Sequence, residues 1–329
     1  MSRELSLAEV FQLGYYWETK ILLTAVKLEV FSCLDSRART AAEAADKLGA
    51  DEQALCLLLN ALVALRVLSK NAEYYSNSRV AQEYLVKHSP QYIGHLLVLH
   101  DAEWDNWGKL EAAVRSGRSP VQQHVFETHP ELGANVLFVL DRIGRRSGPD
   151  LAKRLALDGA RTMLDLGGGA GTNAIAFCRV YPDLVVTVFD LPTTLPLAER
   201  TVKDAGLETR INLLAGDFNR DSLGGSYDVI LMSDVLHYQD SPTNAAVVKK
   251  AFSHLTPGGR LVIKDRYIDP SGTSPAWTTA FAVHIFVNTE HGACYRTVDT
   301  VEWMRAAGFE PVIELERTAV VQGIKPHEP

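Results

Sequence analysis

The sequence has no run of about 18 apolar residues, which is the length that a membrane-spanning helix needs. The first residues, Met-Ser-Arg-Glu-Leu, lack the apolar core of a signal peptide. The four cysteines are widely separated and show no spacing typical of a metal or redox site (Cys33, Cys56, Cys178 and Cys294). These absences argue against a membrane span and a disulfide scaffold, and we expect a location in the reducing cytoplasm.

An excess of positive charge is missing too. The chain has 33 Lys and Arg residues against 40 Asp and Glu residues, a formal net charge of −7. This balance gives no electrostatic reason to bind nucleic acid or an anionic membrane surface, so neither is expected as a partner. The hydrophobic content of 47% and the charged content of 22% are those of an ordinary globular protein, and 329 residues are enough for two domains.

The most informative segment that is present is the glycine-rich stretch from Gly167 to Gly171. Residues 161–166 before it are apolar and predict a short buried strand, and residues 173–181 after it predict a helix. Glycines let the backbone turn sharply and let a ligand approach closely, and the helix N-terminus offers free N–H groups. Strand, glycine turn and helix in this order are typical of a nucleotide-binding unit.

Two cofactor classes compete for such a turn. A dinucleotide site has the spacing G-x-G-x-x-G, whose third glycine would fall at Thr172. A site for S-adenosylmethionine (SAM) has an acid, one residue and then G-x-G-x-G, which Asp165, Gly167, Gly169 and Gly171 match. An acid at position 165 would repel a pyrophosphate and attract the α-ammonium group of SAM. The spacing therefore favours SAM over a dinucleotide.

The next two predicted strands also end in residues that suit a nucleoside. The first ends in Asp190, whose carboxylate is placed to accept hydrogen bonds from both ribose hydroxyls. The second ends in Gly216, Asp217 and Phe218, where the acid can accept from an adenine amino group and the aromatic ring can pack on the base. Taken alone, Asp217 could equally cap a loop.

Strands and helices alternate through the second half of the chain, which predicts an α/β fold with a doubly wound, Rossmann-like parallel sheet. Ligands of such sheets bind beyond the carboxyl ends of the strands, where these motifs lie. A final pair of strands would close one edge as a hairpin. The expected parallel strands are residues 161–166, 184–190, 210–215, 227–233 and 260–267, and the expected hairpin strands are residues 310–316 and 318–323.

The first third of the chain is predicted to be mostly helical. A helix within residues 17–34, a short helix over residues 40–49, a long helix over residues 52–68 and a hairpin over residues 72–78 follow the order of a winged helix. A winged helix raises the possibility of DNA binding. That role is disfavoured, because residues 18–49 carry five basic and five acidic side chains.

We expect a winged-helix-like domain over residues 1–110 and a second domain over residues 111–329. The second domain includes a linking helical segment over residues 132–157. An amphipathic helical pattern runs from residue 132 to residue 146. The pair Gly148-Pro149 is expected to break this helix before a further short one begins.

Together, the motifs resemble those of the class I SAM-dependent methyltransferases. More narrowly, the chain resembles the small-molecule O-methyltransferases typified by caffeic acid and hydroxyindole O-methyltransferases, with their bacterial natural-product relatives. The resemblance covers nearly the whole chain. It rests on Leu-Asp-Leu-Gly-Gly-Gly-Ala-Gly (164–171), Phe-Asp-Leu-Pro (189–192), Ala-Gly-Asp-Phe (215–218), Asp-Val-Leu-His (234–237), Leu-Thr-Pro-Gly-Gly-Arg-Leu-Val-Ile (255–263) and Ala-Ala-Gly-Phe (306–309).

The resemblance implies an enzyme that transfers a methyl group from SAM to a hydroxyl of a small aromatic or polyketide-like acceptor. It also implies that the N-terminal domain dimerises and that the partner subunit of the homodimer helps to close the substrate pocket. The cofactor-binding residues that it implies are Asp165, Gly167, Gly169, Asp190, Leu191, Gly216, Asp217, Phe218 and Ser233.

His237 matches the catalytic histidine of the family and is the implied general base. A phenol, with an unperturbed pKa near 10, needs such a base at neutral pH. The relatives flank this histidine with two acids that orient it. The first matches Asp265, where the family usually has Glu, and the second would fall at Tyr295. Without the second acid, the enzyme needs either a more acidic acceptor or another orienting group such as Glu290.

The acceptor pocket is expected on helices near residues 95–145 and 277–295. Trp104 and Trp107 would share one helix face, and Trp107 is expected to pack in the core. Trp104 or His100 is then a candidate to line a pocket for a flat acceptor. The full set of candidate substrate residues is His100, Trp104, His284, Glu290 and Tyr295.

Three alternatives remain open. His284 and His291 could join His237 in a metal site, as in relatives that C-methylate 2-oxo acids, but their spacing is no recognised ligand pattern and we predict no metal. Some relatives keep the SAM fold and use it for hydroxylation or decarboxylation. A winged-helix regulator that senses SAM is the third alternative, and the charge balance argues against it.

Overall fold

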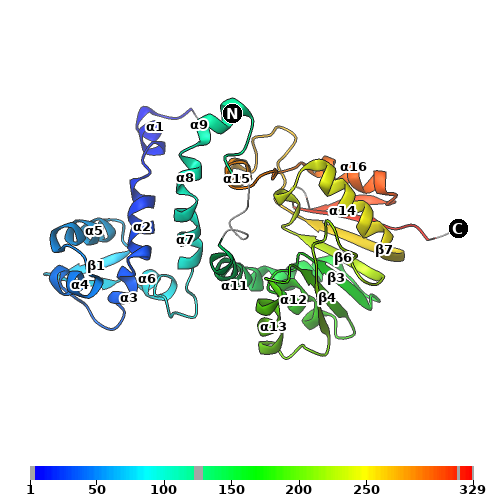
Figure 1. Ribbon diagram of the computed structural model, residues 1–329, viewed down its shortest axis with the longest axis horizontal. Coiled ribbons are helices and arrows are strands. Elements are labelled where there is room, and N and C mark those ends of the chain that lie inside the picture. Colours follow the sequence, from blue (N-terminus) through cyan, green and yellow to red (C-terminus); the bar gives the residue numbers. More distant parts are fainter. Residues whose placement is uncertain (1–3, 122–128, 317–318, 328–329) are drawn as a thin grey trace. The chain divides into compact units, whose positions relative to one another are not determined.

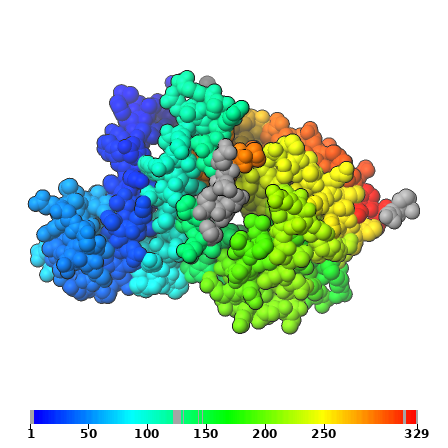
Figure 2. Space-filling view, viewed as in Figure 1, coloured from blue at the N-terminus to red at the C-terminus, as the bar shows by residue number. Residues whose placement is uncertain are grey.

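The computed structural model describes residues 4–121, 129–316 and 319–327 (Figure 1). The chain divides into two compact units, Met1–Trp104 and Asp105–Pro329, and this division falls a few residues before the predicted one. Each unit has its own hydrophobic core. Figure 2 shows the outer surface of the chain from the same side as Figure 1. No helix in the described ranges is long and apolar enough to cross a membrane.

The first unit has the predicted order of helix, short helix, long helix and hairpin. Its elements are α1 (Leu7–Leu13), α2 (Trp17–Lys27), α3 (Val30–Cys33), α4 (Ala41–Leu48), α5 (Glu52–Ala64), β1 (Leu68–Asn71), β2 (Tyr74–Asn77), α6 (Arg79–Tyr84) and α7 (Gly94–Ala102), and the short α8 (Trp104–Trp107) crosses the division. Thr40 opens α4 as a capping box, because its hydroxyl accepts from Glu43 N at 3.2 Å and Glu43 accepts from Thr40 N at 3.0 Å. Tyr75 of the hairpin is buried in the core of the unit.

The second unit is built on a seven-stranded sheet. Its strands are β3 (Thr162–Leu166), β4 (Val185–Asp190), β5 (Ile211–Ala215), β6 (Tyr227–Ser233), β7 (Leu255–Lys264), β8 (Val312–Glu316) and β9 (Val320–Ile324). Their order is β5-β4-β3-β6-β7-β9-β8, with β3 to β7 parallel and β9 antiparallel to both neighbours. The predicted strands are confirmed, although the expected start of the last one at Thr318 lies outside the described residues.

Helices cover both faces of this sheet (Figure 1). The helices of the second unit are α9 (Leu110–Ser116), α11 (Pro130–Leu155), α12 (Thr172–Val180), α13 (Leu195–Asp204), η1 (Leu236–Tyr238), α14 (Ser241–Ser253), α15 (Ala276–Asn288) and α16 (Thr297–Ala307). Successive residues of a strand point to opposite faces. On β3, Met163 packs in one core cluster with Phe177 of α12, and Leu164 packs in the other with Val248 of α14. The chain order reverses between β3 and β6, which is the switch point where such sheets bind ligands.

The prediction that Gly148-Pro149 breaks a helix is wrong. Helix α11 runs unbroken through Pro149, although a proline inside a helix removes one hydrogen bond. Two glycines four residues apart let α11 pack tightly on α12: a Cβ at Gly144 would lie 3.1 Å from Thr172 Cγ2, and one at Gly148 would lie 2.9 Å from Ala176 Cβ. This close packing stabilises the helix across the proline, and it depends on residues far away in the sequence.

Candidate active site and cofactor site

The glycine turn follows β3 and takes a backbone conformation that only glycine adopts easily. Gly167, Gly169 and Gly171 have φ values of +70°, +57° and +77°. A Cβ at Gly167 would lie 2.5 Å from Val235 Cγ1, so no side chain fits there. Gly167 N donates a hydrogen bond of 2.8 Å to Phe189 O on the neighbouring strand. The turn is therefore a fixed cradle open to close approach by a ligand.

Asp190 stands at the carboxyl end of β4 beside this cradle. One carboxylate oxygen accepts from Gly169 N at 2.8 Å, and the other accepts from Leu191 N at 2.7 Å. Burial raises the pKa of Asp190 above its ordinary value, while the two N–H donors oppose that shift. The predicted ribose acid thus lies directly against the glycine turn, and the exposed Leu191 follows it.

Asp165 lies behind the glycine turn, and a direct contact between this acid and a ligand stays a prediction. Its side chain is only 1% exposed, and a Cβ at Gly168 would lie 2.8 Å from its carboxylate. One oxygen accepts from Ala174 N in the first turn of α12 at 3.2 Å. Burial raises the pKa of Asp165 to about 7. Asp165 therefore supports the turn from behind.

The Gly216-Asp217-Phe218 segment reaches the same edge of the sheet from β5. Asp217 accepts from Asn219 N at 2.9 Å, which is the loop-capping role that the sequence left open, and its side chain is 33% exposed. Phe218 lies next to the cradle, because a Cβ at Gly167 would be 3.7 Å from its ring. The acid and the ring are thus placed beside the cofactor turn.

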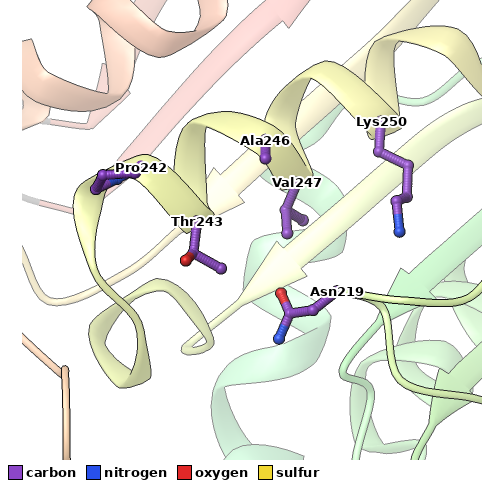
Figure 3. A pocket seen from close by; sticks show the side chains of 6 residues that line it. All are labelled: Asn219, Pro242, Thr243, Ala246, Val247 and Lys250. Carbon is purple, nitrogen blue, oxygen red and sulfur yellow. The ribbon is translucent and has the colours of Figure 1, made fainter.

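A lysine of α14 holds this segment in place. Lys250 Nζ donates to Phe218 O at 2.8 Å and to Asp221 O at 3.0 Å. Lys250 also lines a surface pocket with Asn219 and four residues of the α14 N-terminal half (Figure 3). The sequence pattern did not single out this lysine, because its partners are main-chain oxygens about 30 residues away.

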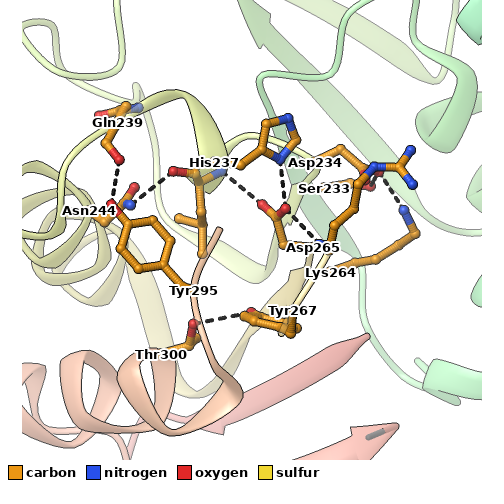
Figure 4. A network of polar contacts seen from close by, with 12 residues as sticks. Ser233, Asp234, His237, Gln239, Asn244, Lys264, Asp265, Tyr267, Tyr295 and Thr300 are labelled. Carbon is orange, nitrogen blue, oxygen red and sulfur yellow. Dashed lines mark hydrogen bonds and ion pairs between the residues drawn. The ribbon is translucent and has the colours of Figure 1, made fainter. Parts of the chain in front are cut away.

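A cavity of about 180 Å³ lies between the glycine turn, α11 and the carboxyl ends of β6 and β7. Ser233, Asp234 and Lys264 line it, together with Asp141 of α11. Ser233 Oγ donates to Asp234 Oδ2 at 3.0 Å, and Lys264 Nζ pairs with the same oxygen (Figure 4). Burial alone would raise the pKa of Asp234. The positive charges of Lys264 and, to a smaller extent, Arg266 outweigh this effect and hold the pKa below its ordinary value.

The contribution of α11 to this cavity was not predicted. The buried Asp141 carboxylate accepts from the Thr172 hydroxyl and pairs with Arg145 Nη2 at 2.8 Å. The spacing of Gly144 and Gly148 was a usable signal, since small residues four apart mark a helix face that another element approaches closely. Pro149, next to Gly148, instead suggested that the helix ends there, so the spacing of the two glycines was overlooked.

His237 and Asp265 form a buried pair at the ends of the neighbouring strands β6 and β7. His237 Nδ1 lies 2.7 Å from Asp265 Oδ1, and the two residues are 3% and 7% exposed (Figure 4). The other carboxylate oxygen accepts from Leu236 N at 2.9 Å. A carboxylate on Nδ1 fixes the tautomer in which Nδ1 carries the proton and Nε2 is free to accept one. The pair has the arrangement of a histidine base with an orienting acid.

One face of α15 places aromatic rings beside this histidine. Trp277, Phe281 and His284 recur at helical spacing, and their rings stack at 4.9 Å and 5.7 Å between successive centroids. His237 meets Phe281 edge-on at 5.2 Å. We refer to Trp277, Phe281 and His284 as the aromatic wall. Of the three residues, only His284 was predicted as a substrate residue, although their helical spacing is visible in the sequence.

Two family descriptions match the chain. Residues 107–310 match the O-methyltransferase domain, and residues 11–87 match the O-methyltransferase dimerisation domain. The chain belongs to the O-methyltransferase family. The first match alone covers more than half of the 329 residues.

Individual O-methyltransferases are similar over almost their whole length. The chain is 30% identical over 322 residues to 3-hydroxy-5-methyl-1-naphthoate 3-O-methyltransferase of Streptomyces sahachiroi, covering 94% of this chain and 92% of that one. It is 29% identical over 314 residues to the tetracenomycin polyketide synthesis 8-O-methyl transferase of Streptomyces glaucescens, covering 94% and 91%. The structure of human N-acetylserotonin methyltransferase in complex with SAM matches with a TM-score of 0.83 at 22% identity, over 99% of this chain and all of that one. This O-methyltransferase uses SAM as its methyl donor.

In this O-methyltransferase, Tyr295 does not replace the second acid of the family. Its hydroxyl donates to the Gln239 main-chain oxygen, and its ring packs edge-on against Trp303 at 4.9 Å. Burial raises the pKa of Tyr295 to about 12, so the hydroxyl is neutral at physiological pH. Glu290 does not orient His237 either, because its side chain is 49% exposed and lies 3.4 Å from His291. Asp265 is thus the acid that contacts the imidazole.

The remaining substrate candidates divide between the two units. His284 belongs to the aromatic wall and lies 3.1 Å from Asn288 Nδ2. Trp107 is 39% exposed with its ring 6.1 Å from that of His284, so the prediction that it packs in the core is wrong. Trp104 packs edge-on against Tyr16 at 5.8 Å within the first unit. A pocket role for Trp104 and His100 stays a prediction.

The alternative of a metal site has no support in the geometry. Among the described residues, no group of three or more His, Cys, Asp or Glu side chains is arranged to hold a metal ion. His284 stacks on Phe281, and His291 pairs with Glu290. The three histidines that were considered as metal ligands, His237, His284 and His291, therefore have separate partners.

Proposed function

We propose that this O-methyltransferase methylates a hydroxyl of a small aromatic or polyketide-like acceptor, with His237 as general base and Asp265 as its orienting residue. The observation that carries this proposal is the 2.7 Å contact of His237 Nδ1 with Asp265, which leaves Nε2 to accept a proton. The aromatic wall beside His237 suits a flat acceptor. Two relatives bear the names of a naphthoate and a polyketide O-methyltransferase, which supports the same acceptor class.

The residues at the switch point fit SAM. Gly167, Gly168 and Gly169 line the cavity beside the turn, and two carboxylates, Asp190 and Asp217, stand at or just after the ends of the neighbouring strands β4 and β5. We assign the ribose hydroxyls to Asp190 and the adenine amino group to Asp217, with Phe218 against the ring. Gly169, Leu191, Gly216 and Ser233 complete the set. SAM supplies a methyl group that its sulfonium makes electrophilic.

The chain's own residues then perform three tasks. Asp265 accepts a hydrogen bond from the Nδ1–H group of His237 and holds the imidazole in one orientation. His237 Nε2 removes the proton of the acceptor hydroxyl as that oxygen becomes the nucleophile. The aromatic wall excludes water from one side of the acceptor and keeps it in a fixed plane, which lowers the entropic cost of the in-line approach.

We also propose that the enzyme is a cytoplasmic homodimer. The match of residues 11–87 to a dimerisation domain supports the dimer, and many large apolar side chains at the N-terminus are exposed. The four cysteines are free thiols, which fits a reducing compartment. The exposed apolar residues are Leu5, Leu7, Val10, Phe11, Leu13, Tyr15, Tyr16 and Trp17.

Calorimetric titration followed by an acceptor screen tests the proposal. SAM and S-adenosylhomocysteine are titrated into the wild type, into Asp190→Ala and into the control Asp183→Ala, whose side chain is 77% exposed and pairs with Arg161. We expect the wild type and the control to bind both compounds, and we expect Asp190→Ala to bind them about tenfold or more weakly. Transfer of labelled methyl to aromatic hydroxyl compounds is then measured. Bound SAM with methyl transfer to carbon or nitrogen acceptors alone would contradict the proposal.

A further inference from the structure

Arg266 is a cation held on the aromatic wall with open hydrogen-bond donors. Its guanidinium carbon lies 4.6 Å from the Trp277 ring centroid and 5.4 Å from that of Phe281. Its one ion pair with a described residue is long, with Nε 3.6 Å from Asp234 Oδ1, and the side chain is 42% exposed. Within the described ranges, the Nη1 and Nη2 groups have no hydrogen-bond acceptor. The rings fix the plane of the guanidinium, and the edge that binds carboxylates stays open.

The neighbouring charges leave a positive excess at this point. Lys264 forms the close ion pair with Asp234, so Arg266 shares a carboxylate that is already neutralised. The Asp265 carboxylate is occupied by His237 Nδ1, Leu236 N and Arg266 N. An anion on the acceptor would therefore meet an unsatisfied guanidinium, and its charge would be stabilised there.

Arg266 and His237 are also within reach of one acceptor. His237 contacts the Phe281 ring at 5.2 Å and Arg266 contacts the same ring at 5.4 Å. A flat molecule lying along the aromatic wall can thus present a hydroxyl to His237 and a second group to Arg266. The second group must be a planar anion with two oxygens if it is to use the open edge of the guanidinium.

We propose that the acceptor is a hydroxyaryl carboxylate whose carboxylate is bound by Arg266. This inference rests on the proposed function, because it assumes that the hydroxyl to be methylated lies at His237. It also accounts for the missing second acid of the family. A tightly bound carboxylate anchors the acceptor at one end, so that a base oriented by Asp265 alone meets a hydroxyl that is already in position.

The test measures binding, which keeps it separate from turnover. Hydroxybenzoates and hydroxynaphthoates are titrated, each as the free acid and as its methyl ester, into protein saturated with S-adenosylhomocysteine. For at least one pair, we expect the wild type to bind the acid about tenfold or more tightly than the ester. Arg266→Gln should remove this preference without weakening S-adenosylhomocysteine binding. Arg266→Lys should keep only part of the preference for the acid, because lysine has the positive charge but lacks the two parallel N–H donors of the guanidinium.

Arg200→Gln is the matched control, since Arg200 also lies over an aromatic ring, 5.0 Å from the Phe138 centroid, and is exposed outside the aromatic wall. It should bind acids and esters as the wild type does. The inference is overturned if no acid binds more tightly than its ester, or if the preference survives in Arg266→Gln. Absence of methyl transfer to every hydroxyl compound, with the binding preference intact, would overturn the proposed function and leave the anion site standing.

Discussion

Asp265 holds both the ring of His237 and the backbone that carries it. One carboxylate oxygen lies 2.7 Å from His237 Nδ1, and the other accepts from Leu236 N at 2.9 Å. The short helix η1 begins at Leu236, so the acid that follows β7 fixes the start of the segment that follows β6. A single buried carboxylate therefore sets the position, the tautomer and the orientation of the candidate base.

Asp265→Asn should slow turnover by about 10- to 100-fold. The asparagine oxygen can still accept one of the hydrogen bonds, but the negative charge that stabilises the imidazolium is lost. The dissociation constant of SAM should stay within about threefold of the wild type, because the residue lies outside the proposed cofactor set. Steady-state kinetics and calorimetry on the same preparation check this. An unchanged turnover rate would show that the carboxylate charge plays no part in proton transfer.

Tyr295→Phe should leave the turnover rate within about threefold of the wild type and lower the free energy of unfolding by about 1 kcal/mol. The hydroxyl donates to a main-chain oxygen rather than to His237, so its loss removes a structural hydrogen bond. Urea unfolding and initial rates measure the two effects. If turnover instead slowed by about 100-fold without loss of stability, Tyr295 would belong to the catalytic machinery.

Gly167→Ala should weaken SAM binding by about tenfold or more, because the new Cβ would lie 2.5 Å from Val235 Cγ1. Gly206→Ala is the matched control: Gly206 has nearly the same φ, +67°, but a Cβ there meets nothing within 4 Å. Both variants strain the backbone by about 1–2 kcal/mol, and only the first disturbs the cradle. Combining Gly167→Ala with Val235→Ala should recover part of the affinity. Equal SAM affinities in the two alanine variants would disprove the clash.

Asp165→Asn should flatten part of the pH dependence of stability in SAM-free protein. The folded-state pKa of Asp165, about 7, lies above its ordinary value, so between about pH 4 and pH 7 the folded protein binds a proton that the unfolded chain releases. The stabilising contribution of the protonated Asp165 side chain is complete below the pKa that this residue has in the unfolded chain. It is lost as the pH rises through 7. The wild type should therefore lose up to about 1.4 kcal/mol per pH unit relative to the variant. The free energy of unfolding of both proteins is measured by urea unfolding at pH 5, 6, 7 and 8. The same pH dependence in the wild type and the variant would refute this prediction.

The sheet and the positions of the main site residues were predictable because they follow from local patterns. Alternation of strands and helices predicts parallel strands, and parallel strands bring their carboxyl ends to one edge. His237 and Asp265 are 28 residues apart, yet each follows a neighbouring strand, and so they meet. The glycine turn was equally visible, since its conformation is encoded by the glycines themselves.

What escaped prediction depends on packing between distant segments. Pro149 is tolerated because Gly148 lets α11 approach Ala176, and no local pattern around Pro149 contains that contact. Asp165 matched a ligand motif, but its burial behind the turn is a property of the folded loop. The aromatic wall shows a helical spacing that core residues share, so the sequence could not separate the two roles.

The turnover of His237→Ala, measured at saturating SAM with an acceptor found in the screen, shows whether His237 removes the acceptor proton. We expect the rate of labelled methyl transfer to fall by about 100-fold or more, while the dissociation constant of SAM stays within about threefold. A variant that binds SAM normally and turns over at the wild-type rate would remove His237 from the reaction.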